Sequence, residues 1–333
     1  MKTYLGVDGG GSKTEFVLID ESGRVLATRR EGPASYLETG VEALRTMLAI
    51  GIHATLTQGS VPPADLTFAF LGLPAYGEDS RLLSVLDDAA SPALPRERYR
   101  CGNDMVCGWA GALAGRDGIN VVAGTGSIAY GEFAGRSARA GGWGELFSDE
   151  GSAYWVAREG LSLFSRMSDS RAEKGPLYEM IRQHFHLGGD LDLCAAVYGP
   201  PPLARSGIAG LAPIVARAAR AGDPQAQRLF DRAAHELAAL VHSVRGKLNP
   251  PPQLPLPVSY SGGMFQFGDL ILDPLRAALS SGRPEYEFAA PRMSPGAGAA
   301  LYAAKLGAEP LTSTAAAELV RQLGAAKADG SLP

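Results

Sequence analysis

Residues 6–20 read GVDGGGSKTEFVLID: an apolar run that ends in Asp8, three glycines, a short polar stretch and a second run of β-branched and aromatic residues. Strand-forming residues on both sides of so tight a turn predict a β-hairpin. Glycines in such a turn let a ligand's oxygen atoms approach backbone N–H groups, and Ser12 and Thr14 add hydroxyl donors. Asp8 would repel a phosphate unless a divalent cation lay between them. The stretch therefore predicts a loop that binds phosphate and Mg²⁺.

Two commoner glycine-rich loops do not fit this stretch. A Walker A loop needs a lysine directly after its last glycine, whereas Ser12 separates Gly11 from Lys13. A Rossmann turn opens a helix, whereas residues 16–19 are strand-forming. The alternative that this stretch leaves open by itself is a plain hairpin turn that binds nothing.

Composition sets the class of protein. With 333 residues and 46% hydrophobic content, the chain can bury a large core, and we expect two domains. A net charge of −4 argues against nucleic acid as a partner. The three cysteines form no CxxC pair, which argues against a disulfide framework or a zinc ribbon. With no leader-like or membrane-spanning apolar run, we expect a cytoplasmic protein that does not bind membranes.

A pattern of strands and helices follows the first hairpin. Residues 25–27 predict a third strand, so that the chain opens with a three-stranded meander. Hydrophobic spacing then predicts alternating helices and strands. The expected elements are a helix at 40–57, a strand at 66–73, a helix at 78–90, a strand at 99–101 and a helix at 105–115.

The same pattern begins again near residue 119. A strand at 119–123 leads into a turn of small residues, and strands at 128–133 and 138–140 follow. The turn consists of Gly124, Thr125, Gly126 and Ser127. Two glycine turns at equivalent points of a duplicated meander are much stronger evidence than one. Facing each other, they could hold one polyphosphate between them.

The rest of the chain is largely helical. With a new meander beginning near residue 119, we expect a first domain at 1–117, a second domain with helical insertions at 118–308, and a tail at 309–333. The expected helices are 150–167, 176–185, 207–221, 225–248, 268–281 and 295–305, with strands at 258–261 and 285–289 and one further helix in the tail.

Four motifs carry a resemblance to a known family. They are DGGGSKT at 8–14, Asp104, GTGS at 124–127 and GGWGELFSDEGSAYW at 141–155. Together they resemble the N-acetylglucosamine kinase family, of the BadF/BadG/BcrA/BcrD type, within the wider group of hexokinase, actin and Hsp70-like ATPases. The resemblance extends to about residue 305. It implies an α/β fold with two ribonuclease-H-like domains flanking a cleft, ATP with Mg²⁺, phosphorylation of a sugar's primary hydroxyl, and a homodimer.

The resemblance also implies roles for individual residues. Asp8 would hold Mg²⁺ and Asp104 would accept the proton of the sugar hydroxyl, although Asp104 could instead cap the helix that follows it. Gly210, Gly262 and Gly263 would lie near the adenosine, although they could instead be ordinary helix and turn glycines. The implied ATP-binding residues are Gly9, Gly10, Gly11, Ser12, Lys13, Thr14, Gly124, Thr125, Gly126, Ser127, Gly210, Gly262 and Gly263.

The sugar side is implied by the segment at 141–155. Trp143 would offer an apolar face to the sugar ring, and Asp149 would accept hydrogen bonds from sugar hydroxyls, with Gly142 and Gly144 beside them. A lone tryptophan is more often part of the core, and Asp149 could simply begin a helix. Two positions depart from the family pattern. Ser35 stands where the family commonly has a sugar-binding asparagine, and Ser148 stands where it usually has glycine.

Three functions are open from the sequence. The favoured one is an ATP-dependent kinase that phosphorylates the 6-hydroxyl of an amino sugar, with N-acetylglucosamine first and glucosamine or a muramyl sugar next. The second is an ATPase that activates an acyl-CoA reductase or dehydratase, which would need cysteine thiolates around an iron–sulfur cluster. The third is a sugar sensor without turnover, against which the retained Asp104 argues.

Overall fold

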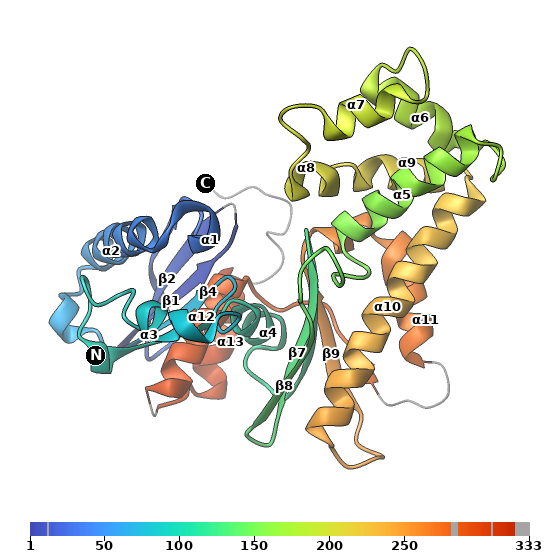
Figure 1. Ribbon diagram of the computed structural model, residues 1–333. Coiled ribbons are helices and arrows are strands. Elements are labelled where there is room, and N and C mark those ends of the chain that lie inside the picture. Colours follow the sequence, from blue (N-terminus) through green and yellow to red (C-terminus); the bar gives the residue numbers. More distant parts are fainter. Residues whose placement is uncertain (12, 281–285, 308, 324–333) are drawn as a thin grey trace. The chain divides into compact units, whose positions relative to one another are not determined.

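The computed structural model describes residues 1–11, 13–280, 286–307 and 309–323, and it divides into two compact units (Figure 1). The first unit contains residues 1–117 and the described residues from 290 onward. The second contains the described residues from 118 to 289. Each unit is built on a five-stranded mixed sheet.

The first sheet opens with the predicted hairpin. Strands β1 (Thr3–Gly9), β2 (Thr14–Asp20) and β3 (Val25–Glu31) form an antiparallel meander, in which Gly9 and Thr14 are the last pair before the turn. Strands β4 (Phe68–Leu73) and β5 (Tyr99–Asn103) extend the sheet parallel to β1, so that the order is β3-β2-β1-β4-β5. The hairpin and the three-stranded meander are confirmed.

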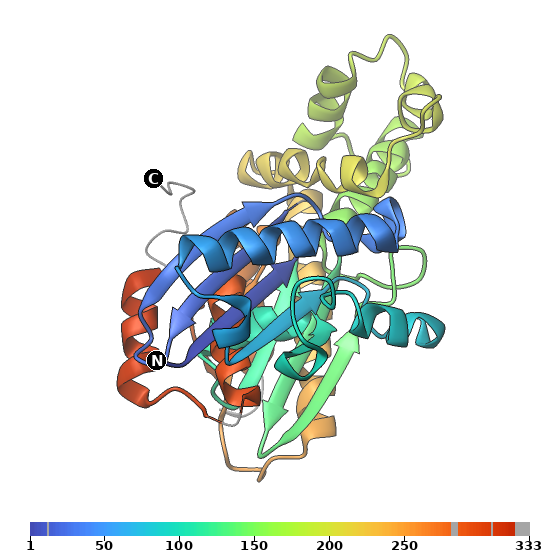
Figure 2. The ribbon, with the colours of Figure 1, turned by 90° about the vertical axis from the view of Figure 1, so that its left-hand side faces the viewer.

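Helices cover the two faces of the first sheet. Helix α2 (Val41–Gln58) lies along one face, because its apolar stripe packs with Leu5 and Val7 of β1 in one core (Figure 2). Gly6, between these two residues, faces helix α12 (Pro295–Leu306), which packs with α4 (Met105–Leu113) on the other side. The remaining elements are α1 (Tyr36–Thr39), η1 (Pro63–Asp65), η2 (Ser80–Leu82), α3 (Leu83–Asp87), η3 (Arg96–Arg98) and α13 (Ser313–Leu323).

Helix α12 lies in a different unit from the one that we expected. We placed residues 295–305 in the second domain, whereas α12 packs on β1 and α4 of the first unit. The contact depends on small residues: a Cβ at Gly6 would lie 2.0 Å from the backbone nitrogen of Ala300, and one at Gly298 would lie 2.1 Å from that of Gly111. Such close backbone approach requires glycine on both elements.

The second sheet repeats the first. Strands β6 (Gly118–Ala123), β7 (Ser127–Phe133) and β8 (Arg136–Gly141) form an antiparallel meander, and β9 (Leu256–Ser261) and β10 (Tyr286–Phe288) continue it in parallel with β6. The order β10-β9-β6-β7-β8 is that of the first sheet, read from the other edge. The predicted duplication is therefore confirmed. Residue 285, the expected first residue of the edge strand, lies outside the described residues.

Helix α10 (Pro224–Leu248) covers the second sheet, with Asp223 as its predicted N-cap accepting from the amides of Gln225 and Ala226. The expected helix at 207–221 is broken into two, since Pro213 in the first turn of the second piece has no N–H to continue the ladder. The other elements are α5 (Ala153–Ser168), α6 (Pro176–Phe185), α7 (Asp192–Tyr198), α8 (Arg205–Ala209), α9 (Ala212–Arg220), η4 (Gly263–Phe267) and α11 (Asp269–Ser280).

Two expectations about helices differ from the structure. The single helix expected at 78–90 is a 3₁₀ turn, η2, followed by the short α3, and α7 was not predicted. Helices α5 to α9 gather at one end of the second unit (Figure 1). Within the described part of the chain, none of the helices combines the length and apolar character needed to cross a membrane.

Candidate active site

The first glycine turn is held by backbone hydrogen bonds. The Gly10 amide donates to the Lys13 carbonyl, and the Ala34 amide donates to the Gly10 carbonyl, both at 2.9 Å. Gly11 is exposed, and its amide has no partner among the described residues, so it is free for a ligand. Ser12, an expected phosphate ligand, lies outside the described residues.

The end of this hairpin is more tightly packed than we expected. A Cβ at Gly9 would lie 2.8 Å from the Gly72 carbonyl oxygen, so only glycine fits there. We expected the Thr14 hydroxyl to face a phosphate. Instead Thr14 is buried, and its hydroxyl donates to the Gly32 carbonyl at 2.8 Å, because the alternation of the strand turns this side chain toward the meander.

Asp8 and Asp104 lie at the same edge of the first sheet. Asp8 is near the end of β1 and pairs with Gly72 of β4, which in turn pairs with Gly102 of β5. Asp104 directly follows β5, and its amide donates to the Leu73 carbonyl at 3.3 Å. Since the three strands are parallel, their carboxyl ends meet at one edge and bring the two carboxylates beside the first glycine turn.

Gly72 makes this arrangement possible. A Cβ there would lie 2.2 Å from the Cys107 sulfur and 3.0 Å from the Cα of Asp104. Cys107, in the first turns of α4, is fully buried, and its thiol donates to the Val7 carbonyl at 3.6 Å. No local sequence pattern predicts this role of Gly72, because it depends on the close approach of β4 and α4.

Both carboxyl groups have raised pKa values. Burial raises the pKa of Asp8 to about 8, and the charges of Asp104 and Glu15 act in the same direction. Burial also raises the pKa of Asp104 to about 6. Lys13 opposes the shift at Asp8 only weakly. A second cation close to Asp8 would favour its ionised form.

Asp104 stands at the N-cap position of α4, but its side chain makes no capping hydrogen bond with the described residues. The Asn103 side-chain oxygen accepts from the Met105 amide at 3.1 Å, and the Asn103 amide group donates to the Tyr76 carbonyl at 3.1 Å. Asn103 therefore takes part in holding the first residue of the helix, and the Met105 amide also opposes the rise in the pKa of Asp104.

Ser35 lies close to the first glycine turn. It follows Ala34, whose amide contacts the turn, and occupies the N-cap position of α1. Its side chain caps no amide, and its hydroxyl has no partner within the described ranges. A half-buried serine in this position has a hydroxyl that can bind a ligand.

The second glycine turn lies in the second unit. The Gly124 amide donates to the Gly126 carbonyl, and the Gly124 carbonyl accepts from the Ala153 amide at the start of α5, both at 2.9 Å. The amides of Thr125 and Gly126 have no partner in the part of the chain that the structure describes. Gly262 packs against this turn and has a φ of 105°. A Cβ there would lie 2.4 Å from the Ala123 carbonyl oxygen, so only glycine fits.

Ser127 stabilises the second turn through its own contacts. Its hydroxyl donates to the Glu150 carbonyl at 2.6 Å, and its amide donates to Asp149 Oδ1 at 3.2 Å. We expected this hydroxyl to face a phosphate, but the side chain is buried under residues 149–151. Of the other expected nucleotide residues, Gly210 ends α8 and Gly263 begins η4, and both are exposed.

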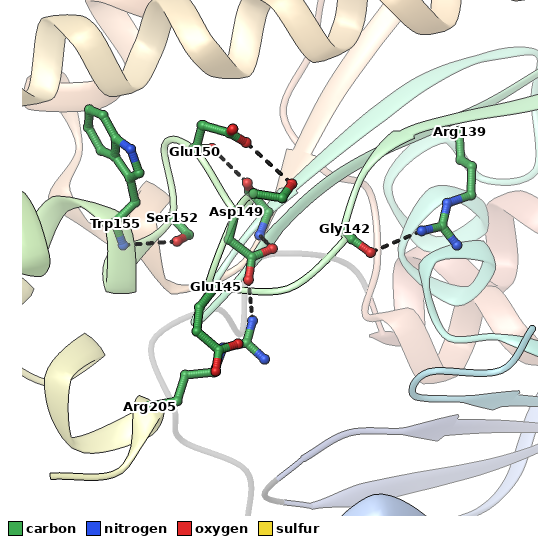
Figure 3. Close-up of polar contacts among 10 residues, drawn as sticks. Arg139, Gly142, Glu145, Asp149, Glu150, Ser152, Trp155 and Arg205 are labelled. Carbon is green, nitrogen blue, oxygen red and sulfur yellow. Dashed lines mark hydrogen bonds and ion pairs between the residues drawn. The ribbon is translucent and has the colours of Figure 1, made fainter. Parts of the chain in front are cut away.

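Asp149 is the centre of a polar network (Figure 3). It is 2% exposed and has a positive φ of 62°. One carboxylate oxygen accepts from the Ser127 amide, and the other forms an ion pair with Arg205, whose Nε lies 3.2 Å from Glu145 Oε2. Burial raises the pKa of Asp149, while the Ser127 amide and Arg205 oppose the shift. Sequence reasoning missed Arg205 and Glu145.

The segment after β8 exposes Trp143. The side chain is 70% exposed, so the reading of this tryptophan as core is wrong. Gly142 and Gly144 have φ values of 69° and 97°, and these backbone conformations turn the segment outward. The Arg139 guanidinium donates to the Gly142 carbonyl at 3.0 Å (Figure 3). The same guanidinium lies 5.9 Å from the Trp143 ring centroid. Ser148 is buried and its hydroxyl donates to Glu150 at 3.3 Å.

The duplicated sheet with a glycine turn in each copy defines an α/β fold of two similar units. The chain shares its fold with the ROK family glucokinase from Streptomyces griseus in complex with glucose and AMPPNP, at a TM-score of 0.50 and 21% identity, with 96% of this chain and 99% of that chain covered. The family follows from the sequence: the chain belongs to the BadF/BadG/BcrA/BcrD ATPase family, which matches residues 5–303.

Two kinases and one further structure are similar to this chain. The N-acetyl-D-glucosamine kinase of Dictyostelium discoideum is 26% identical, over 90% of this chain and 97% of its own. The N-acetylmuramic acid/N-acetylglucosamine kinase of Clostridium acetobutylicum is 31% identical, over 73% and 79%. A crystal structure from Chromobacterium violaceum, provisionally assigned as an N-acetylglucosamine kinase, is 28% identical with a TM-score of 0.70, over 90% of this chain and 98% of that chain.

Proposed function

We propose that this protein is an ATP-dependent kinase that transfers the γ-phosphate to the 6-hydroxyl of an amino sugar, with N-acetylglucosamine as the first candidate. The observation that carries the proposal is the meeting of Asp8 and Asp104 beside the first glycine turn, at one edge of the first sheet. The names of the similar kinases support the class of substrate.

Asp104 is the proposed general base. Its side chain makes no capping hydrogen bond among the described residues, and burial raises its pKa to about 6, close to the pH at which a base of this kind works best. In the proposed reaction it accepts the proton of the sugar hydroxyl as the oxygen attacks the γ-phosphorus and ADP leaves. The carboxylate only has to be within hydrogen-bond reach of that hydroxyl.

Asp8 is the proposed metal ligand. Its neighbours fit a divalent cation, because the half-buried carboxyl groups of Asp8 and Asp104 repel each other there, and Lys13 opposes the rise in the Asp8 pKa less than the Cys107 hydrogen bond does. The described residues contain no group of three or more His, Cys, Asp or Glu side chains arranged to hold a metal ion, so ATP oxygens and water would supply the other ligands. Mg²⁺ would neutralise charge on the phosphates.

Five further expected residues are assigned to the two proposed substrates. The free amides of Gly11, Thr125 and Gly126 would bind ATP oxygens. Trp143 and Ser35 would bind the sugar, because one is an exposed aromatic ring and the other has an unused hydroxyl. The proposal includes a homodimer, which the family resemblance stated above implies, and a cytoplasmic location.

A coupled assay of ADP release across a panel of sugars tests the proposal. The panel contains N-acetylglucosamine, glucosamine, N-acetylmuramic acid and glucose, and the variants are Asp104→Asn and the exposed control Asp65→Asn. We expect release that depends on an amino sugar, a loss of about 10²–10⁴-fold in Asp104→Asn, and normal turnover in Asp65→Asn. ADP release that is equal with and without sugar would instead favour an ATPase of another function.

Cys101 and Cys107, two of the three cysteines, do not support the role of an iron–sulfur activator, whereas Cys194 is exposed. Cys107 is fully buried, and burial raises the pKa of its thiol well above the usual value. Burial likewise raises the pKa of Cys101 to about 12. Thiols with such pKa values remain protonated at neutral pH, whereas a cluster needs thiolates. Iron and acid-labile sulfide measurements on the purified protein provide a direct check.

A further inference from the structure

Arg205 joins the helical part of the second unit to its glycine turn. The residue begins α8, and its guanidinium contacts two carboxylates: Nη2 pairs with Asp149 and Nε lies 3.2 Å from Glu145 (Figure 3). The pair also packs against the turn itself. A Cβ at Gly126 would lie 2.6 Å from Arg205 Nη2 and 2.9 Å from each oxygen of Asp149. Arg205, Asp149 and Gly126 therefore form one packed contact.

We propose that Arg205 is a positioning residue for nucleotide binding: it holds the Asp149 carboxylate against the Ser127 amide and thereby fixes the turn at residues 124–127. This inference rests on the proposed function, in which the turn binds ATP phosphates. In the fixed turn the amides of Thr125 and Gly126 have no partner among the described residues, and they could donate to phosphate oxygens.

The surroundings of Asp149 explain why an arginine is needed. The side chain is 2% exposed, so its carboxylate cannot be satisfied by water. Ser127 supplies one hydrogen bond, and Arg205 is the cation that contacts the other oxygen. Glu145, which shares the guanidinium, adds negative charge nearby. Without Arg205, two carboxylates would remain beside the turn, and the buried one would be left uncompensated.

The geometry favours arginine over lysine. Arg205 reaches Glu145 with Nε and Asp149 with Nη2, so one side chain neutralises both partners through the fixed fork of its guanidinium. A lysine at this position has a single ammonium group. It would keep the charge but could not reproduce both contacts with the same directions. Arg205→Lys should therefore retain only part of the effect.

Binding of MgADP, measured by titration calorimetry on the full chain, tests the inference without turnover. For Arg205→Met we expect the dissociation constant of MgADP to rise about tenfold, with Arg205→Lys between it and the unchanged protein. The control is Arg217→Met on α9, an exposed arginine that forms no ion pair with the described residues, which should bind MgADP normally. Thermal denaturation of each variant shows whether the fold is retained.

A double variant separates positioning from general damage. Asp149→Asn keeps a side-chain oxygen for the Ser127 amide and removes the buried charge, so it also relieves any instability of Arg205→Met. If Arg205 acts through Asp149, Arg205→Met should weaken MgADP binding much less in the Asp149→Asn background than in the native one. Equal losses in both backgrounds would overturn the inference.

The pH dependence of MgADP binding gives a second readout. Arg205 opposes the burial that raises the pKa of Asp149, whereas the Glu145 carboxylate acts in the same direction as burial. The nearby Glu150 carboxylate is engaged by the Ser148 hydroxyl. Removing Arg205 raises the Asp149 pKa further, so in Arg205→Met the uncompensated carboxylate is protonated at a higher pH than in the unchanged protein, and the loss of MgADP affinity should shrink as the pH falls. A pH profile identical to that of the unchanged protein would contradict this.

The outcomes distinguish this inference from the proposed function. If the unchanged protein neither binds MgADP nor releases ADP in the presence of an amino sugar, the proposed function fails. If it does both, and Arg205→Met matches Arg217→Met in MgADP affinity and pH profile, the role given to Arg205 is wrong while the kinase assignment stands.

Discussion

Replacing Gly72 by alanine should damage the candidate active site from within the first sheet. The new Cβ would lie 2.2 Å from the Cys107 sulfur and 3.0 Å from the Cα of Asp104, far inside van der Waals contact. Relieving this overlap requires α4 to move away from β4, and overpacking of this kind costs about 1–3 kcal/mol. We expect a loss of unfolding free energy in this range.

The same shift should impair catalysis more than stability. Asp104 begins α4, so a displacement of the helix moves its carboxylate away from the acceptor hydroxyl. A misplacement of about 1 Å can lower turnover by about 10²-fold. We therefore expect Gly72→Ala to reduce kcat strongly in the sugar-dependent ADP assay while the protein remains folded at room temperature.

Two comparison variants test whether the overlap at Gly72 causes these losses. Gly246→Ala introduces the same methyl group on the exposed side of α10, where nothing lies within 4 Å, and should stabilise the protein by up to about 1 kcal/mol. Adding Cys107→Ala to Gly72→Ala removes the nearest clashing atom and should restore part of the lost stability. Native stability and turnover in Gly72→Ala would refute the packing argument.

Three further predictions follow from individual side chains. Thr14→Val should cost about 0.5–1.5 kcal/mol in urea denaturation, because the Gly32 carbonyl loses a donor, and should leave the KM for ATP unchanged; a higher KM would restore this hydroxyl as a phosphate ligand. Asp8→Asn should stabilise the protein increasingly as pH rises from 4 to 8. The pKa of Asp8 is raised to about 8 in the folded protein, so between its ordinary pKa and pH 8 the carboxyl group ionises only in the unfolded chain, and this favours unfolding. A gain in unfolding free energy that is the same at pH 4 and pH 8 would contradict this. Trp143→Ala should raise the KM for the sugar without lowering the melting temperature, because the ring is 70% exposed; a lower melting temperature would indicate a structural role.

Local sequence patterns predicted most of the fold. The hairpins around both glycine turns and the long helices α2 and α10 have their own signals: glycine turns between β-branched runs, and apolar residues at helical spacing. Asp8 and Asp104 could be proposed from the sequence because each stands at the end of a strand. Their position at one edge follows from the parallel strand order.

Hydroxyl groups in the turns were harder to predict. Thr14 and Ser127 stand in loops rich in potential phosphate donors, but both are buried and donate to backbone carbonyls. The type of side chain tells which bonds it can make, whereas its orientation depends on strand alternation and on segments distant in sequence. For the same reason, the sequence did not predict that the Asn103 side chain accepts from the Met105 amide at the start of α4.

The sequence alone determined the duplicated order of strands, the two glycine turns and the carboxylates at strand ends, because these features depend on the conformational preferences of neighbouring residues. Tertiary structure alone decided that α12 packs on β1, that Gly72 makes room for α4, and that Arg205 reaches Asp149 from a position 56 residues later in the chain. Such contacts depend on shape and charge at distances that only the folded chain brings within reach, so no local pattern encodes them.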